Sequence, residues 1–274
     1  MKLKILNQKA EEKGSIDVPS QFKETPRHDL IKRAVETIRA NTRQPYGAKP
    51  EAGLRHSTYL SKRRRAYKGT YGPGRARTPR KVMSSNGLQF HHVGAQVPNT
   101  VGGRRAHPPK AAKIWNKDLN KKERQKAIRS ALSGTLIKEL AEKRGHKVPS
   151  NYPFIISDEL SKIEKTADLK KALEKQGFKE ELTRTSKTKI RQGKGKNRGR
   201  KYKNKTSILF VTAESNQKLE KAASNLKGCD VTSVDKLNTL LLAPGAVPGR
   251  LTLYTESAVK KIKEENLFQR GESK

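Results

Sequence analysis

One stretch of the sequence, residues 44–114, cannot belong to a globular core. It is rich in Lys and Arg, holds a single acid, Glu51, and is interrupted at short intervals by prolines and glycines. Proline removes a backbone donor and glycine favours turns, so we expect no helix or strand to persist here. Helical patterns precede and follow the stretch, which is therefore anchored at both ends. A long cationic segment that cannot pack against protein predicts a polyanionic partner; we name residues 44–114 the basic arm.

Cationic side chains spread along the basic arm are the main candidates for contacts with that partner. They are Arg55, Lys62, Arg63, Arg64, Arg65, Lys68, Arg75, Arg77, Arg80, Arg104, Arg105, Lys110 and Lys113, with Trp115 where the chain leaves the arm. Interleaved with them are the aromatic residues Tyr46, Tyr59, Tyr67, Tyr71 and Phe90. Unpaired RNA bases stack on aromatic rings and guanidinium planes, whereas the bases of duplex DNA are mostly hidden. The arm therefore favours RNA, with a DNA-compacting protein as a less favoured alternative.

The charge of the whole chain agrees with a polyanionic partner. The 274 residues carry 62 Lys and Arg against 26 Asp and Glu, a formal net charge of +36. RNA, DNA or an anionic membrane surface could each bind such a chain, but no apolar run approaches the ~20 residues that cross a bilayer. We therefore expect a cytoplasmic protein with no membrane partner. The single cysteine, Cys229, excludes a disulfide framework and a cysteine-based metal site.

The residues before the arm predict a hairpin followed by a helix. Lys2–Leu6 and Ser15–Val18 alternate apolar and polar residues on either side of a polar turn. Thr25 and Pro26 then provide a helix start, because a hydroxyl can cap the helix and proline fits its first turn. Apolar residues at helical spacing continue this helix to about Asn41, at the entrance of the arm.

A second helix is predicted after the arm. Asn120 and Glu123 have the spacing of a capping box, and an apolar stripe continues toward Gly145, the predicted stop. The first turns carry several cations, of which Lys121 and Arg124 are candidate RNA contacts. The N-terminal end of a helix favours acids over cations, so this placement makes sense where the helix end meets phosphate.

From Pro153 onward the sequence alternates strands with helices. The pattern predicts strands at residues 154–156, 207–212, 230–232 and 251–254, and helices at 167–176, 216–226 and 256–265. This alternation is typical of an α/β fold in which helices cover a mostly parallel sheet. We therefore expect one globular domain, formed by residues 1–43 and 115–274.

A second basic segment, residues 185–205, precedes the strand at 207–212, and we name it the basic loop. It contains no acid, and its glycines would let the backbone approach phosphate closely. Its candidate RNA contacts are Lys194, Lys196, Arg198, Arg200, Lys201 and Tyr202. A dinucleotide-binding fingerprint precedes a helix, whereas a strand follows here. A disordered, solvated loop is the alternative interpretation.

No constellation of residues in the sequence predicts catalysis or a cofactor. His91 and His92 are adjacent, so their side chains point in different directions, and no nearby Cys, Asp or Glu completes a metal site. GxSxG, HExxH and Walker-type motifs are not present. The alternative to a binding protein is an RNA-modifying enzyme with an α/β cofactor domain. Such an enzyme would need a glycine-rich strand-to-helix turn with a nearby acid, and we find none.

Eight segments, in order along nearly the whole chain, match a known family. They are TPRHDLIKRAV (25–35), GPGRARTPR (72–80), GGRRAHPPK (102–110), NKKERQKAIRSAL (120–132), TKIRQGKGKNRGRKY (188–202), SILFVT (207–212), LAPGAVPGRL (242–251) and YTESA (254–258). With them the chain resembles the L-four family of large-subunit ribosomal proteins, in its archaeal and eukaryotic form. Eukaryotic members carry a long basic C-terminal extension, and this sequence ends soon after its last predicted helix. The resemblance is therefore to the archaeal type.

The resemblance implies a fold, a set of partners and a place. Family members have a three-layer α/β/α domain and a long extended loop that threads through large-subunit ribosomal RNA. The loop's tip approaches the peptide exit tunnel and the nascent peptide, near the loop of the twenty-second large-subunit protein. By position the tip here is residues 81–97, with Met83, Gln89, Phe90, His91 and His92 as candidate tunnel residues. The implied role is structural, in cytoplasmic ribosomes and without a cofactor: to bind RNA, support subunit assembly and line the tunnel.

In the protein free of RNA, we expect protease to cleave within residues 44–114 before it cleaves elsewhere. Ordering a residue costs about 1–2 kcal/mol, and the arm has few apolar residues to offset that cost. Limited trypsin digestion followed by mass spectrometry would show early cuts in the arm and a resistant remainder. An arm as resistant as the remainder would contradict this expectation.

Overall fold

The computed structural model describes residues 1–67, 69–72 and 74–269, and the predicted RNA contact Lys68 lies outside them. The chain divides into two units. The first combines Met1–Thr42 with Asn116–Lys274, and the second is Arg43–Trp115, which contains the basic arm. The first unit is mixed α/β, so the predicted fold class is confirmed at that level.

The first sheet of the α/β unit has the strand order β2-β1-β5. β1 (Lys2–Leu6) pairs antiparallel with β2 (Glu12–Asp17) and parallel with β5 (Ile155–Ile156). The predicted N-terminal hairpin is confirmed, but β2 begins at Glu12 rather than at Ser15. Its early residues are exposed and pair through the backbone, so they leave no apolar alternation in the sequence.

The second sheet is parallel and centres on β8 (Leu209–Thr212). This strand lies between β10 (Thr252–Tyr254) and β9 (Asp230–Ser233). All four residues of β8 are buried. Leu209 belongs to one core cluster and Phe210 to another, because successive side chains of a strand point to opposite faces. Burial on both faces is the reason why the sequence of this strand is apolar almost throughout.

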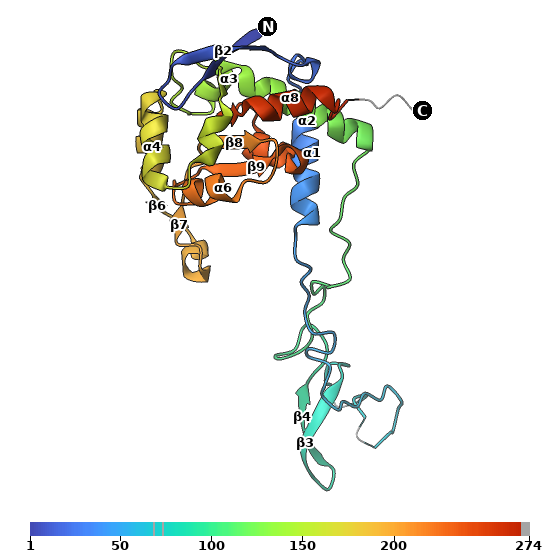
Figure 1. Cartoon of the computed structure of the whole chain (residues 1–274). Helices are drawn as coiled ribbons and strands as arrows, with labels where there is room; N and C mark the ends of the chain where they lie inside the picture. Colours follow the sequence, from blue (N-terminus) through green and yellow to red (C-terminus); the bar gives the residue numbers. More distant parts are fainter. Residues whose placement is uncertain (68, 73, 270–274) are drawn as a thin grey trace. The chain divides into compact units, whose positions relative to one another are not determined.

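Helices contribute to both core clusters. In Figure 1, β8 and β9 run side by side with α6 below them and α8 above. The first cluster takes in α1 (His28–Asn41), α2 (Lys121–Leu136), α7 (Thr239–Leu242) and α8 (Glu256–Glu264). The second takes in α4 (Thr166–Lys175) and α6 (Gln217–Ser224), and the unit also contains α3 (Lys138–Lys143) and α5 (Lys179–Ser186). Short 3-10 segments are η1 (Ser20–Phe22), η2 (Asp158–Lys162), η4 (Val234–Lys236) and η5 (Pro244–Ala246). None of the helices within the described ranges has the length and apolar character that spanning a bilayer requires.

The predicted helix caps are wrong on both sides of the arm. α1 begins three residues beyond Thr25, without a side-chain cap. α2 begins directly after Asn120, as predicted, but the Asn120 side chain finds no capping partner among the described residues. Glu123, the expected second half of the capping box, instead forms an ion pair with Arg33 of α1 at 3.1 Å. An ion pair between two helices has therefore replaced the expected capping contact within α2.

The predicted second helix is two helices. Ile137, with an extended ψ of 108°, separates α2 from α3, which ends before Gly145. The break coincides with the approach of a distant turn. A Cβ on Gly249 would lie only 2.7 Å from the backbone carbon of Leu140, at the start of α3. Apolar spacing within one segment carries no sign of such a tertiary contact, so the sequence predicted a continuous helix.

A buried arginine, Arg250, ties together the ends of several elements. It is 1% exposed, and its guanidinium donates to the carbonyl oxygens of Ser207 and Leu241, both at 3.0 Å. It also donates to the Gly228 carbonyl at 3.3 Å and pairs with Asp230 at the start of β9. The planar guanidinium satisfies carbonyls that would otherwise be buried without donors. The last residues of the LAPGAVPGRL segment therefore hold the starts of β8 and β9 together.

The unit Arg43–Trp115 contains a hairpin, so the expectation that the basic arm holds no regular element is wrong. β3 (Arg80–Asn86) pairs antiparallel with β4 (Gln89–Gly94), and Gly87 and Leu88 form the turn between them. Gly87 has a φ of +54°, which glycine adopts without strain. A glycine at the first position of a two-residue turn is a known hairpin signal, but the polar residues around Gly87 concealed the strands.

The rest of this unit is a doubled-back chain held by its backbone. The Ala48 N–H donates to the Pro109 carbonyl at 2.9 Å, and the side-chain amide of Gln96 donates to the His56 carbonyl at 2.8 Å. At Gly47 a Cβ would lie 2.4 Å from the Ala111 backbone nitrogen, so only glycine allows this approach. Outgoing and returning segments therefore lie side by side with little apolar burial between them.

The basic loop forms a short hairpin. β6 (Lys189–Ile190) pairs antiparallel with β7 (Tyr202–Lys203), and the 3-10 turn η3 (Lys194–Arg198) lies between them. Residue 185, where the sequence placed the start of this loop, is a buried threonine inside α5. The loop therefore leaves the folded unit after Ser186.

Candidate nucleic-acid interface

Most of the predicted RNA contacts in the arm are exposed. The exposed cations are Arg55, Lys62, Arg63, Arg64, Arg65, Arg75, Arg77, Arg104, Arg105, Lys110 and Lys113, while Arg80 and Trp115 are half-buried. The unit Arg43–Trp115 carries sixteen Lys and Arg against one acid. Within its described residues, no Lys or Arg forms an ion pair with a carboxylate. These charges are therefore available to an external polyanion.

Trp115 forms the centre of one aromatic and cationic cluster. Its ring stacks on that of Tyr46, with centroids 5.9 Å apart and planes at 22°. The Arg43 guanidinium carbon lies 4.7 Å from the Trp115 centroid, and the Lys113 Nζ lies 4.5 Å from it. Cations over an aromatic face are attracted by its quadrupole. The cluster places stacking surface and positive charge together, the combination that single-stranded nucleic acid uses.

A second cluster forms around Tyr71. The guanidinium carbons of Arg64 and Arg77 lie 5.3 and 5.0 Å from the centroid of its ring. These arginines come from separate parts of the arm, so the tyrosine orients two of the predicted phosphate contacts. A guanidinium that rests on a ring keeps its donors free to bind phosphate in two places at once.

The predicted tip residues lie on the β3–β4 hairpin but do not share one face. Along β4, Gln89 and His91 are exposed, whereas Phe90 and His92 are half-buried. Alternation of this kind places the two pairs on opposite faces of the hairpin. Met83 sits at a register shift of β3 and is exposed. The predicted tip residues are therefore divided between two faces of the hairpin.

In the basic loop the predicted contacts are exposed: Lys194, Lys196, Arg198, Arg200, Lys201 and Tyr202. Gly193 and Gly199 flank the η3 turn with φ of +81° and +74°. Arg191 braces the loop from inside, because its Nε donates to the Arg200 carbonyl at 3.1 Å. The backbone thus fixes a turn from which the cations project.

At the start of α2, Lys121 and Arg124 are both exposed. The acid of this first turn, Glu123, is engaged by Arg33. A partial positive charge at a helix N-terminus adds to the charge of these two side chains. The arrangement is unfavourable on its own and favourable beside phosphate.

Sequence reasoning missed a buried carboxylate beneath the basic loop. Glu181 of α5 has no exposed surface and accepts two bonds from Arg184, at 2.6 and 2.7 Å. It also lies 2.8 Å from His146 Nδ1 and accepts from the Ser207 hydroxyl at 3.1 Å. Arg184 in turn donates to the Thr206 carbonyl at 2.7 Å. The network therefore fixes α5 and the start of β8, the two ends from which the basic loop emerges.

The same network sets the pKa of the carboxyl group. Burial by itself would raise the pKa of Glu181, but hydrogen bonds from Arg184, His146 and the Lys147 N–H outweigh burial and lower the pKa to about 2. In the sequence, Glu181 and Arg184 have the spacing of an ordinary surface pair on a helix. Nothing in that spacing distinguishes a buried pair from an exposed one, so the sequence held no usable signal.

Basic side chains surround a cavity of about 580 Å³ that adjoins this network at Arg184. It is lined by Lys147, Lys179, Glu180, Thr183, Arg184, Lys187 and Lys205. Because Arg184 pairs with Glu181, the unpaired charges of the rim are its lysines and Glu180. The lysines outnumber this single acid. The cavity extends the positive surface of the basic loop onto α5.

An α/β unit joined to an acid-poor, aromatic-lined basic arm is typical of proteins that bind nucleic acid. Residues 16–265 match the Ribosomal protein L4/L1 family, and the chain belongs to this family. It is 42% identical over 268 residues to the large ribosomal subunit protein uL4 of Nanoarchaeum equitans, covering 98% of this chain and 100% of that protein. The proteins of the same name from Halobacterium salinarum and Methanocaldococcus jannaschii are each 42% identical, over 96% of this chain and 99% of theirs. The resemblance seen in the sequence is therefore confirmed.

Replacing Glu181 by Gln should remove an acid-sensitive part of the stability of the α/β unit. The folded pKa of Glu181 is about 2, below the ~4.3 of an unfolded Glu, so its ionised form stabilises the fold above about pH 5. That contribution, on the order of 3 kcal/mol, is lost as the pH falls from about 5 to about 1. Urea unfolding along a pH series should show E181Q less stable at neutral pH and less sensitive to acid. The exposed neighbour Glu180→Gln is the matched control, and equal behaviour of the two variants would refute the role of the network.

Replacing Arg198, Arg200 and Lys201 of the basic loop by alanine should weaken RNA binding without unfolding the α/β unit. Each lost phosphate contact should flatten the dependence of log K on log salt by about 0.7–0.9. The measurement is a salt titration of RNA affinity, with urea unfolding as the control for stability. An unchanged salt slope would remove the loop from the interface.

Proposed function

We propose that this chain is a structural component of the archaeal large ribosomal subunit that binds ribosomal RNA and supports subunit assembly. Membership of the Ribosomal protein L4/L1 family and the name shared by its archaeal relatives support this role. The observation that carries the proposal is the unbalanced charge of Arg43–Trp115, sixteen cations against one acid. Phosphate contacts supply the sequence-independent part of RNA affinity, and such a unit offers many of them.

In this proposal the α/β unit, residues 1–43 and 115–274, is a folded base, and residues 44–114 are the arm that enters the RNA. We further propose that its two sheets form one mostly parallel layer between two helix layers. The parallel bridge between Ile156 of β5 and Thr255, just after β10, supports one layer. The two core clusters support helices on both faces. A rigid base of this kind would set where the arm starts and ends.

The cations predicted from the sequence would serve as phosphate contacts on two surfaces of the chain. Those of the arm would cross-link RNA segments by neutralising phosphates that otherwise repel one another. Those of the basic loop and of the start of α2 would fix the base on the RNA surface. Binding of this type positions a protein without reading sequence. The protein would therefore act in the ribosomes of the cytoplasm as an assembly element.

The tip of the arm has a different chemistry, which supports a different neighbour. Residues 82–92 contain no Lys or Arg, and Val82, Met83 and Leu88 are exposed apolar side chains. Apolar, uncharged surface suits a peptide better than a phosphate backbone. We propose that the tip lines the peptide exit tunnel, beside the loop of the twenty-second large-subunit protein, where it meets the nascent peptide.

An RNA-modifying enzyme with an α/β cofactor domain is not favoured. The family is one of ribosomal proteins. The glycine-rich basic loop precedes a strand, whereas cofactor-binding turns lead into a helix.

Shortening the hairpin should separate anchoring from the tunnel function. Because Lys81 pairs with Val93, residues 82–92 can be replaced by an Asn-Gly turn that closes a shorter hairpin. The change removes no Lys or Arg, so we expect subunits to incorporate the shortened protein while stalling by nascent peptides is altered. The measurements are sedimentation of subunits from cells that carry the variant and a stalling reporter.

The opposite variant tests the anchoring charges. Replacing Lys62, Arg63, Arg64 and Arg65 by serine keeps the hairpin and should strongly reduce incorporation, because phosphate contacts supply most of the affinity. If the shortened hairpin blocked incorporation as completely as this variant, the tip would be a primary anchor and the proposed division of the arm would be wrong.

A further inference from the structure

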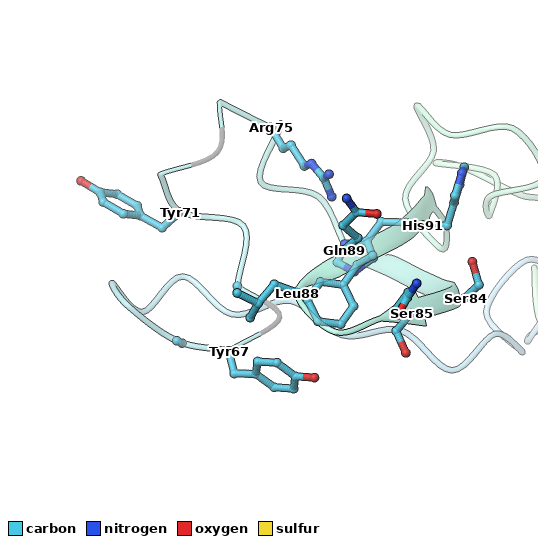
Figure 2. A pocket seen from close by; sticks show the side chains of 13 residues that line it. Tyr67, Tyr71, Arg75, Ser84, Ser85, Leu88, Gln89 and His91 are labelled. Atoms are coloured by element: carbon cyan, nitrogen blue, oxygen red, sulfur yellow. The ribbon is translucent and has the colours of Figure 1, made fainter.

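A cavity of about 770 Å³ lies beside the β3–β4 hairpin. Two segments of the same unit line it: the chain before the hairpin, with Tyr67, Tyr71 and Arg75, and the hairpin itself, from Ser84 to His92. Figure 2 shows the Arg75 side chain extending toward Gln89, with the ring of Tyr67 on the other side of Leu88 and Tyr71 pointing outward. The cavity is large enough to hold a small molecule or a single nucleotide unit.

The lining combines aromatic rings with polar side chains and contains no acid. Tyr67 and Phe90 meet edge to face with centroids 5.4 Å apart, and Phe90 lies 5.4 Å from the His92 ring. Tyr67 nevertheless remains 64% exposed, and the neighbouring Leu88 is 84% exposed. A protein that leaves such apolar surface open at a concave site commonly covers it with a ligand.

The chemistry of the walls selects the ligand. Exposed ring surface suits a flat, aromatic group, and the amides of Asn86 and Gln89 can both donate to and accept from its polar edge. Arg75 contributes a cation, and the whole unit is strongly positive, so the ligand carries negative charge. A flat group with a polar edge, joined to an anion, is a nucleotide.

We infer that this cavity holds one unpaired nucleotide of the bound RNA, with its base against the rings of Tyr67 and Phe90 and its phosphate at Arg75. The inference rests on the proposed function, because the arm must first bind RNA. It goes beyond that function by adding a contact that depends on an unstacked base. Phosphate contacts cannot distinguish a flipped base from a paired one, whereas a ring-lined cavity of this size can.

The test compares variants that differ only in ring character. Tyr67→Leu and Phe90→Leu keep apolar bulk and charge but remove the stacking surface. With the full-length chain and a short unstructured single-stranded RNA, we expect each variant to lose about 10-fold in affinity while the slope against salt stays unchanged. Phe90→Tyr keeps the ring and should bind like the wild type. Ultraviolet crosslinking should attach a nucleotide to a peptide from residues 66–92.

Two controls separate this inference from the proposed function. Arg63→Ala, outside the cavity, should flatten the salt slope by about 0.7, because it removes a phosphate contact rather than a stacking one. A chain that lacks residues 44–114 should lose most of the slope. If deletion of the arm left the slope unchanged, the proposed RNA-binding function itself would fail.

The inference about the cavity would fail separately. It is overturned if the arm contributes to the slope but both leucine variants bind like the wild type, or if crosslinks fall only outside residues 66–92. It is also overturned if Phe90→Tyr loses as much affinity as Phe90→Leu, because the ring would then serve packing alone. Leucine variants that alter nascent-peptide stalling with full RNA affinity would assign the cavity to the peptide instead.

Discussion

Repulsion among like charges is the constraint on which the arrangement of this chain depends. Sixteen cations and one acid in Arg43–Trp115 cannot be neutralised from within that unit, and a hydrophobic core cannot form among them. The unit instead takes its shape from backbone bonds between outgoing and returning segments, such as Ala48 to Pro109. Aromatic rings at Trp115 and Tyr71 each attract cations and so hold them close together. The cations repel one another, and a nearby polyanion offsets that repulsion.

The α/β unit solves the opposite problem, because it must stay folded while its surface carries excess positive charge. Its stability comes from a sheet buried on both faces, with alternate residues of β8 divided between two core clusters. Two of its buried charges, Arg250 and Glu181, are matched by partners inside the protein. Arg250 meets carbonyl oxygens and Asp230, and Glu181 meets Arg184, so neither charge is left uncompensated inside the protein.

The parts predictable from the sequence are those set by local pattern. Mostly apolar segments predicted β8 and β10, and amphipathic spacing predicted α1, α4, α6 and α8. The failures have tertiary causes. Glu123 pairs with Arg33 instead of capping α2, and Gly249 packs against Leu140 near the break between α2 and α3. In the candidate interface the exposed cations could be named from composition, but Glu181 and the cavity beside Phe90 arise from residues distant in sequence.

Cations and aromatic rings have different roles when such a chain binds RNA. Cations draw the arm toward any phosphate backbone, so by themselves they would hold it in many registers on folded RNA. A register becomes fixed only where a contact demands a particular RNA conformation, and a ring-lined cavity that accepts an unstacked base makes that demand. Because residues 82–92 carry no Lys or Arg, they contribute little to the electrostatic attraction between the arm and RNA phosphate. Their contacts can depend on the conformation of the RNA instead. The cations of the arm therefore supply its anchoring, and its uncharged end adds a preference for one RNA conformation.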